Sequence, residues 1–343
     1  MADFSILIQE WFRQSARNLP WRGITDPYKI WLSEVILQQT RVDQGTSYFL
    51  KFIKTFPKIE DLANAKEDEV LNLWQGLGYY SRARNMHYSA QLVVNEFGGV
   101  FPTTHKEVLS LKGVGEYTAA AITSIAYGLP HAVVDGNVYR VLSRYLAIDT
   151  PIDSTEGKKL FAKVADEFLD PANSGDHNQA VMELGALVCL PKKPKCVDCP
   201  VSESCMAYGK DTQLDFPVKA KKTKVTKRFF HYLVITDGKN TVLKKRIGKG
   251  IWQGLYDFPL IEKEDELNET DLIGYDFNKF DFDGSFKHIL SHQKIRASFW
   301  IVDVSEIKVS EGQVVVPIND VEDYPLPQLL IRYINASRLF GAD

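Results

Sequence analysis

Apolar residues in the first part of the chain recur at the spacing of an amphipathic helix. Segments 67–74, 119–127 and 138–146 carry them at positions i, i+3 and i+4, with glycine or proline between the segments. This pattern predicts that residues 1 to about 210 are helical throughout.

The pattern changes from about residue 228. Residues 228–238 alternate and then turn, and the chain continues as residues 241–246, which predicts a β-hairpin. Further strands are expected at 293–304 and 312–317, with a closing helix at about 326–340. A polar, lysine-rich segment, 211–227, separates the halves. The fold class is therefore multidomain, with an all-α domain, a linker and a smaller α+β domain.

Composition and charge change this picture little. The 343 residues are 45% hydrophobic and 25% charged, which is ordinary for a globular protein of two or three domains. The net charge of −3 argues weakly against a nucleic-acid partner. No apolar run reaches the length of a membrane span, and residues 1–4 carry no cationic leader, so we expect no membrane partner and a cytoplasmic location, on the nucleoid if the source is bacterial.

All four cysteines of the chain lie in one stretch of 17 residues. Cys189, Cys196, Cys199 and Cys205 follow the spacing C-x6-C-x2-C-x5-C. Disulfide frameworks belong to small secreted chains, so a metal centre is favoured. Zinc prefers two C-x2-C pairs set well apart, and only one such pair is present, so the spacing favours an iron–sulfur cluster over zinc.

Basic residues gather near these cysteines. Lys192, Lys193 and Lys195 fill the loop between the first two, where a rigid metal centre would present them to DNA phosphates. A second basic run, within 219–228, is interpreted as a solvated linker.

Two carboxylates stand in opposite local environments. On a helix, three of the four neighbours of Glu34 at i±3 and i±4 are apolar, which would raise its pKa and make it a general acid. Asp135 precedes a periodic helix and is a helix N-cap candidate, a position that favours the ionised form. Acid-catalysed glycosidic cleavage requires this division of roles. A buried structural glutamate and a plain cap remain open alternatives.

A glycine-rich turn lies between them in the sequence. Residues 111–118 contain Gly113 and Gly115 around one apolar residue and run directly into a helix of small residues. Such a turn, with a helix N-terminus behind it, can direct backbone N–H groups at an anion. Taken alone, an ordinary interhelical turn is the other interpretation.

Together, the turn at 111–117, Asp135 and the four-cysteine spacing resemble the helix-hairpin-helix DNA glycosylase superfamily. The resemblance covers residues 1 to about 215. It implies that the hairpin grips the DNA backbone, that the aspartate serves the chemistry and that the cysteines hold one 4Fe–4S cluster.

The branch within the superfamily follows from a few positions. Endonuclease III-like members carry a catalytic lysine where this chain has Tyr117, and they lack a glutamate at the position of Glu34. Stretches 19–22, 33–40, 76–85 and 134–138 look like adenine DNA glycosylases of the MutY type. This resemblance extends over the full length and implies a monofunctional enzyme that removes adenine opposite 8-oxoguanine, and also opposite guanine, without β-lyase strand cleavage.

The same resemblance implies residue roles. Glu34 would protonate adenine at N7 and Asp135 would stabilise the oxocarbenium-like sugar, supported by Asn137 and Tyr117. Contacts to the flipped adenine or to the bases beside 8-oxoguanine are implied for Trp21, Arg22, Gln39, Thr40, Tyr79 and Gln179.

Residues 228–343 look like the Nudix-like recognition domain of this family. No Arg-Glu pair follows Gly254 at the distance that a Nudix metal box needs, so pyrophosphohydrolase activity is not expected. The family's Phe-Ser-His motif, which inspects 8-oxoguanine, aligns with Leu290, Ser291 and His292. The leucine departs from the aromatic residue, which puts its packing or wedge role in doubt.

The expected domain organisation is a helix-hairpin-helix catalytic domain at 1–212, a basic linker at 213–227 and the Nudix-like domain at 228–343. Within the first, a six-helix module spans about 21–130, and an iron–sulfur module combines 1–20 with 131–212. We expect a monomer acting on double-stranded DNA. The alternatives are an endonuclease III-like or thymine-mismatch glycosylase, a non-catalytic iron–sulfur DNA-binding protein and a structural zinc protein.

Overall fold

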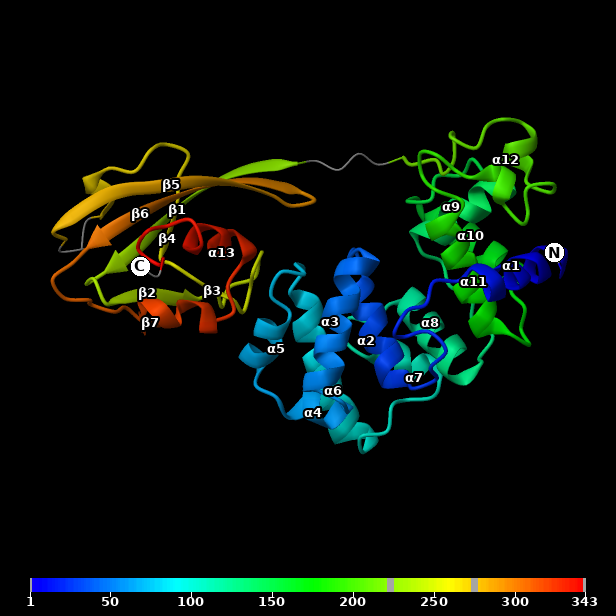
Figure 1. The fold of residues 1–343 in the computed structure, drawn as a ribbon, viewed down its shortest axis with the longest axis horizontal. Helices are drawn as coiled ribbons and strands as arrows, with labels where there is room; N and C mark the ends of the chain where they lie inside the picture. Colours follow the sequence, from blue (N-terminus) through cyan, green and yellow to red (C-terminus); the bar gives the residue numbers. More distant parts are fainter. Residues whose placement is uncertain (1, 221–224, 273–276, 342–343) are drawn as a thin grey trace. The chain divides into compact units, whose positions relative to one another are not determined.

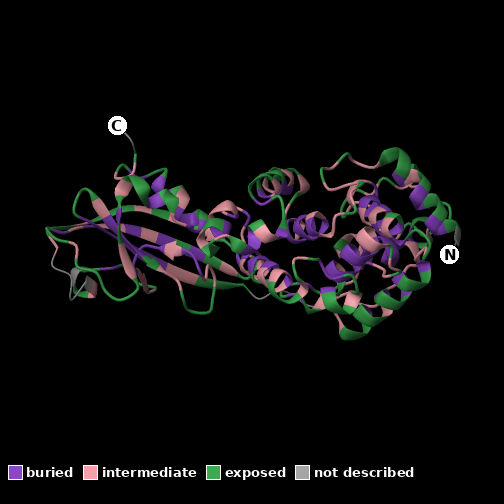
Figure 2. Cartoon of the chain, turned by 90° about the horizontal axis from the view of Figure 1, so that it is seen from below, coloured by how far each residue is buried: buried purple, intermediate pink, exposed green. Residues whose placement is uncertain are grey.

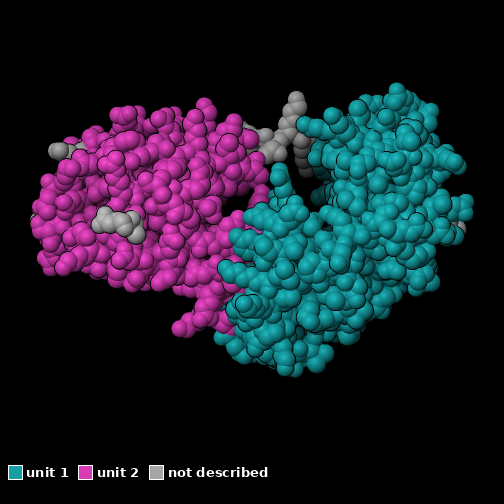
Figure 3. All heavy atoms as spheres, viewed as in Figure 1, with its two compact units in different colours: residues 1–64, 85–221 teal, residues 65–84, 222–343 magenta. Residues whose placement is uncertain are grey.

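The chain forms two compact units in a computed structural model that describes residues 2–220, 225–272 and 277–341. Unit 1 comprises residues 1–64 and 85–221, and unit 2 comprises residues 65–84 and 222–343 (Figure 3). The predicted linker 213–227 and its basic run lie partly outside the described residues. The expected domain boundaries at 212 and 228 stay predictions.

Unit 1 is helical, as the periodicity predicts (Figure 1). Its helices are α1 (Ala2–Ser15), α2 (Pro27–Leu37), α3 (Val42–Thr55), α4 (Ile59–Asn64), most of α6 (Ser81–Phe97), α7 (His105–Ser110), α8 (Glu116–Tyr127), α9 (Gly136–Tyr145), α10 (Thr155–Phe168), α11 (Ser174–Leu187) and α12 (Met206–Gly209). A 3-10 turn, Cys196–Asp198, lies within the cysteine loop. No helix among the described residues is long and apolar enough to span a membrane.

Local sequence explains where the key helices begin and end. The side chain of Asp26 caps α2 by accepting hydrogen bonds from two backbone N–H groups, and Pro27 occupies the first turn, where its missing N–H costs nothing. Helix α8 buries a continuous run of small residues, 118–124, and ends at Gly128, whose φ of +67° is the left-handed conformation typical of a helix end.

One core of unit 1 joins the N-terminal helix to segments distant in the sequence. Phe4, Ile8 and Phe12 of α1 are buried against apolar side chains of α9, α10 and α11. Figure 2 shows buried residues gathered where helices of unit 1 face one another. The N-terminal helix is therefore packed against the last long helices of unit 1.

Unit 2 contains a seven-stranded sheet and one described helix after it. The strands are β1 (Thr226–Thr236), β2 (Asn240–Lys245), β3 (Tyr256–Asp257), β4 (Leu260–Glu262), β5 (Lys279–Ile289), β6 (Gln293–Asp303) and β7 (Gln313–Pro317). The main order is β3-β2-β1-β6-β5, with β4 paired to β1 and β7 to β2. Two 3-10 turns, Glu269–Leu272 and Ile318–Asp323, and helix α13 (Gln328–Ile334) complete the α+β unit.

The predicted hairpin, strands and closing helix are present, with three differences. The hairpin β1–β2 has a single register pair, Thr236↔Thr241, because β4 pairs with the same edge of β1 at Phe230–Tyr232. On its other edge β1 pairs with β6, in parallel, from Thr226↔Gln293 to Thr236↔Asp303. Strands β3, β4 and β5 were not predicted. The closing helix is shorter than 326–340, since it begins after Pro327 and ends at Asn335.

Residues 65–84 belong to unit 2 by their contacts. This segment contains α5 (Glu67–Leu73) and the turn that follows it. Lys245 Nζ lies 2.7 Å from Asp68 Oδ1, and Asn72 Nδ2 donates to the carbonyl of Asp323 at 2.6 Å. Trp74 and Tyr80 of this segment are buried, so their rings contribute to packing.

Candidate active site

A cavity of about 370 Å³ in unit 1 collects most of the predicted catalytic and adenine-contacting residues. Its wall is formed by residues from 17–22, the end of α2 with the turn after it, Tyr117 of α8, the start of α9, and α11. Eight predicted residues line it: Trp21, Arg22, Glu34, Gln39, Thr40, Tyr117, Asp135 and Asn137.

Glu34 has the apolar environment that its helical neighbours predict. The residue is 9% exposed on α2, between the buried Ile30 and Trp31 on one side and the Leu37 turn on the other. Burial raises its pKa to about 7, with a further upward contribution from the charge of Asp135. The hydroxyl of Tyr117 donates to Glu34 Oε2 at 2.7 Å and acts in the opposite direction. Near neutral pH the carboxyl is therefore available as a proton donor.

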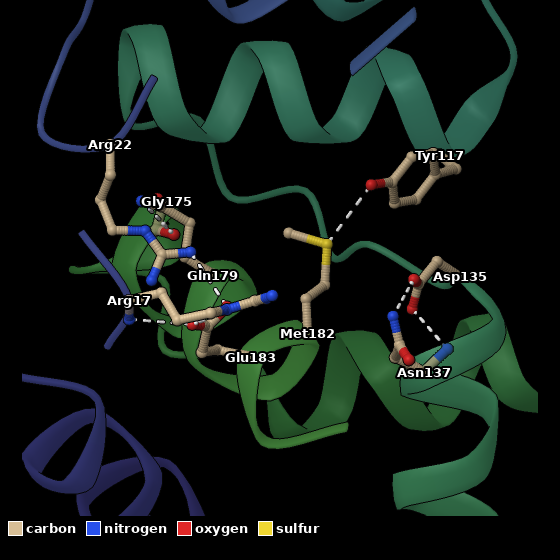
Figure 4. Close-up of polar contacts among 9 residues, drawn as sticks. All are labelled: Arg17, Arg22, Tyr117, Asp135, Asn137, Gly175, Gln179, Met182 and Glu183. Carbon is tan, nitrogen blue, oxygen red and sulfur yellow. Dashed lines mark hydrogen bonds and ion pairs between the residues drawn. The ribbon is translucent and has the colours of Figure 1, made fainter. Parts of the chain in front are cut away.

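Asp135 is the N-cap of α9, as predicted. Its Oδ1 accepts hydrogen bonds from the backbone N–H groups of Asn137 and Val138, at 2.9 and 2.7 Å. Its Oδ2 accepts from Asn137 Nδ2 at 2.8 Å, and Figure 4 shows the contacts with Asn137. The hydrogen bonds of the cap lower the pKa of Asp135, as its position before the helix predicts. Burial raises the pKa of this carboxyl above its ordinary value, and the cap donors only partly offset that effect.

The predicted glycine turn joins α7 to α8. Gly113 has a φ of +83°, and a Cβ there would lie 2.8 Å from Asn85 Cβ, so both backbone conformation and space require glycine. Gly115 is the N-cap of α8 and carries no side-chain cap. The first N–H groups of α8 are therefore open to an external acceptor such as a phosphate.

A charged cluster that the sequence did not reveal forms another part of the wall. Glu183 of α11 is buried and accepts from Arg17 Nε and Nη2, both at 2.8 Å, and from Arg22 Nη2 at 3.2 Å (Figure 4). These hydrogen bonds hold the pKa of Glu183 below its ordinary value despite burial. In the sequence, the one indication of this cluster was that a charged residue, Glu183, stands among apolar residues of α11.

Arg22 lines the cavity, and its guanidinium lies 4.7 Å from the centroid of the Phe12 ring. Its Nε and Nη1 are buried and have no hydrogen-bond partner in the part of the chain that the structure describes. Unpaired buried donors are costly, so a ligand with acceptor atoms would satisfy them. Gln179, which was expected here, is not among the lining residues; its Nε2 lies 3.4 Å from the carbonyl of Gly175.

Two predicted DNA-inserting residues have strained backbones. Gln39, exposed in the turn after α2, has a φ of +55°, and Tyr79, which is 45% exposed, has a φ of +48°. Positive φ is costly for residues with a Cβ and often accompanies function. Tyr79 belongs to unit 2 and contributes to a different cavity.

That second cavity, of about 510 Å³, lies within unit 2. It is lined by the turn 77–81, by residues 250–253 and by the tip of the β5–β6 hairpin, and it includes Tyr79, Leu290, Ser291 and His292. Ser291 and His292 are exposed, with 3.1 Å between Ser291 Oγ and His292 Nδ1. The structure thus places Tyr79 in the same cavity as Ser291 and His292, which are distant from it in the sequence.

The four cysteines line one small cavity of about 30 Å³ in unit 1. All four are free thiols, and the guanidinium of buried Arg144 lies 3.4 Å from Cys189 Sγ while binding the carbonyls of Leu190 and Pro191. Among residues 2–220, 225–272 and 277–341, no group of three or more His, Cys, Asp or Glu side chains is placed to hold a single metal ion. The chemistry of the donor set, four partly buried thiols that line one cavity, fits an iron–sulfur cluster, which is held by cysteine thiolates. Lys192, Lys193 and Lys195 are exposed beside it.

Comparisons with known proteins agree with this geometry. Residues 32–167 match the family described as HhH-GPD superfamily base excision DNA repair protein, and residues 231–336 match the NUDIX domain. A structure of a thermostable thymine-DNA glycosylase is 31% identical over 60% of this chain and 95% of its own, with a TM-score of 0.56. An endonuclease III–DNA complex, 19% identical with a TM-score of 0.52, covers 62% of this chain and 98% of its own and shows the fold alone. The protein is thus a base-excision-repair DNA glycosylase of the helix-hairpin-helix class with a Nudix-like domain.

The sequence relatives narrow this class. The adenine DNA glycosylase of Buchnera aphidicola subsp. Baizongia pistaciae is 36% identical over 86% of this chain and 85% of the relative. The adenine DNA glycosylase of Mus musculus is 46% identical over 58% of this chain and 40% of the relative. The chain belongs to the adenine DNA glycosylase family. It is a hydrolase that cleaves N-glycosidic bonds in DNA.

Proposed function

We propose that this glycosylase removes adenine opposite 8-oxoguanine by acid-catalysed hydrolysis and does not cleave the strand. The observation that carries the proposal is the pairing of a buried Glu34, with a pKa of about 7, and the capped carboxylate of Asp135 in one cavity. Glu34 protonates N7 of the flipped adenine, which makes the base a better leaving group. Asp135 stabilises the positive charge that develops on the sugar as the C–N bond breaks.

Adenine selectivity follows from the charged cluster of the wall. The edge of adenine that pairs with another base offers a ring nitrogen acceptor and an amino donor. Arg22 supplies unpaired N–H donors, and Glu183 supplies a carboxylate acceptor that Arg17 holds in place. A hydrogen-bond donor and an acceptor are thus both present beside the proton donor. A base that could not match them would leave buried polar groups unpaired, which is costly.

The absence of an amine in the cavity supports a monofunctional reaction. A lyase needs a lysine that attacks the sugar and forms a Schiff base. Among the described residues that line the 370 Å³ cavity, the cations are Arg17 and Arg22, and no lysine is present. Tyr117 occupies the expected lysine position and donates to Glu34 instead.

Recognition of the opposite 8-oxoguanine is assigned to the cavity of unit 2. Tyr79 supplies an exposed aromatic ring that can stack on a base, and Ser291 and His292 supply polar groups beside it. Leu290, half-buried at the hairpin tip, lends an apolar contact in place of an aromatic one.

The four cysteines are proposed to hold one 4Fe–4S cluster. Bound there, it would cross-link the loop 189–205 and fix the three exposed lysines for contact with DNA phosphates. Their free thiols agree with a reducing cytoplasmic compartment. We further propose that the enzyme acts as a monomer.

The test is base release without strand cleavage. A duplex with one adenine opposite 8-oxoguanine is incubated with the protein, and half of each sample is treated with alkali. Breaks only after alkali support the proposal, breaks without alkali contradict the monofunctional reaction, and no breaks in either contradict the activity. Duplexes with adenine opposite guanine or thymine, and thymine opposite guanine, report the base specificity.

Two variants locate the proton donor. Glu34→Gln keeps the shape of the side chain but removes the acid, and should lower the rate of release by about 10²- to 10⁴-fold while sparing DNA binding. Glu10→Gln, an exposed glutamate on α1, is the matched control and should leave the rate unchanged. Substantial activity in the first variant would place the acid elsewhere.

A further inference from the structure

Met182 lies in the catalytic cavity but has no role in the chemistry described so far. It is half-buried on α11, between the buried Val181 and the charged Glu183. Figure 4 shows its side chain extending from α11 with the sulfur toward the hydroxyl of Tyr117. The distance from Tyr117 Oη to Met182 Sδ is 3.3 Å, and the same oxygen lies 2.7 Å from Glu34 Oε2.

This arrangement places two acceptors around a single hydrogen. A tyrosine hydroxyl has one hydrogen to donate, and a thioether is a weak acceptor. An ionised carboxylate is a much stronger acceptor, so the hydrogen belongs to Glu34 whenever that group is charged. A neutral carboxyl competes far less, and the sulfur of Met182 is then the acceptor within reach.

We propose that Met182 is a positioning residue for the proton donor, because its sulfur accepts the Tyr117 hydrogen when Glu34 is protonated and thereby stabilises the acid form. The inference rests on the proposed role of Glu34 as general acid. In the reaction, the proton passes from Glu34 to the ring nitrogen of adenine, and the electron pair of the C–N bond leaves with the base. The Tyr117 hydrogen turns from Met182 to the new carboxylate, and no proton leaves the tyrosine.

Replacing Met182 leaves the charged groups around Glu34 unchanged. Methionine carries no charge, so replacing it leaves every titratable neighbour in place. These neighbours are Tyr117 at the start of α8, Asp135 before α9, and Glu183 on α11 with its partners Arg17 and Arg22. A change in the pH profile on replacing Met182 therefore reports the sulfur contact.

The experiment is a pH profile of single-turnover adenine release by the full chain, from about pH 5 to about pH 9. The wild type should lose activity as the pH rises through about 7, where Glu34 ionises. Met182→Leu conserves volume but removes the acceptor. The alkaline limb of this variant should move to lower pH by roughly half a pH unit. At pH values above the limb the rate should then be about threefold lower than in the wild type, with little change on the acidic plateau.

Three further variants separate this effect from packing. Met182→Gln restores an acceptor and should return the limb to the wild-type position or above it. In a Tyr117→Phe background, Met182→Leu should cause no shift, because the shared hydrogen is gone. Met86→Leu, a buried methionine of α6 outside the cavity, should leave the profile unchanged.

The outcomes distinguish the two proposals. The role of the sulfur is overturned if Met182→Leu leaves the alkaline limb of the pH profile where it is in the wild type. It is also overturned if Met182→Gln lowers that limb as much as Met182→Leu does. In both cases the role of Glu34 as general acid still stands. If Glu34→Gln retains activity and the wild type shows no alkaline limb, the acid assignment fails and the role of Met182 fails with it. If Met182→Leu does not fold, the Met182→Gln limb decides, and a downward shift there refutes the inference.

Discussion

Replacing Glu34 with glutamine should stabilise the protein above neutral pH while it abolishes base release. A glutamine carries no proton to donate and no charge to bury. In the wild type, burial of the carboxyl against the apolar side of α2 disfavours its charged form. The residue needed for chemistry is therefore a residue that weakens the fold at the pH where it is ionised.

The magnitude follows from the two pKa values. The pKa is about 7 in the folded state, against an ordinary value of 4.5. Below 4.5 both states hold the proton and no cost arises. Between 4.5 and 7 only the folded state keeps it, so the free energy of unfolding falls as the pH rises, and above 7 the cost is constant. The difference of 7 − 4.5 corresponds to about 3 kcal/mol at pH 8 and to about 1 kcal/mol at pH 5.

The assay is urea unfolding followed by helical circular dichroism, for wild type and variant, at pH 5 and pH 8. We expect Glu34→Gln to be more stable by about 3 kcal/mol at the higher pH and by about 1 kcal/mol or less at the lower. An equal difference at both pH values would refute the reasoning. Glu183→Gln is the contrasting control and should destabilise, because it leaves Arg17 and Arg22 without a buried carboxylate.

Three other predictions address the remaining parts of the site. Asp135→Asn keeps a side-chain cap but loses the charge, so the melting temperature should change little while single-turnover release falls by about 10²-fold or more. Replacing the three lysines of the loop 189–205 with alanine should weaken DNA binding and reduce the salt dependence of the affinity by about three phosphate contacts, measured by fluorescence anisotropy at several salt concentrations. Ser291→Ala should reduce the preference for 8-oxoguanine over guanine, measured as the ratio of release rates from the two duplexes, without changing the rate opposite guanine.

Local patterns were sufficient for those parts of the site that depend on neighbours along the chain. The apolar residues around Glu34 predicted its burial, and Asp135 is the N-cap that its position before a periodic helix indicated. The left-handed φ of Gly113 follows from a glycine turn. Each of these features is decided within one or two turns of the backbone, where sequence spacing and spatial proximity coincide.

Contacts between distant segments could not be predicted in the same way. In the sequence, nothing distinguishes Glu183 from other polar residues on a helix. Its ion pairs with Arg17 and Arg22 form only because α11 packs beside them. The upward shift in the pKa of Asp135 has a similar origin, because its desolvation depends on the packing around α9 and not on the cap. In unit 2, β5 escaped prediction because its alternation is diluted by charged residues and by an irregularity between Phe282 and Gly284.

Short contiguous segments were enough to predict the four-thiol loop, the capped aspartate and the apolar surroundings of the glutamate, and the change of hydrophobic pattern near residue 228 was enough to predict two parts. The packing of distant segments was needed to show that Glu34, Tyr117, Met182 and Asp135 line one cavity, and that Tyr79 lines another with the β5–β6 hairpin. The physical reason is that desolvation and hydrogen-bond competition act over a few ångströms of space. The segments that meet there are separated by up to about 200 residues along the chain, from Tyr79 to Ser291 in one cavity and from Glu34 to Met182 in the other.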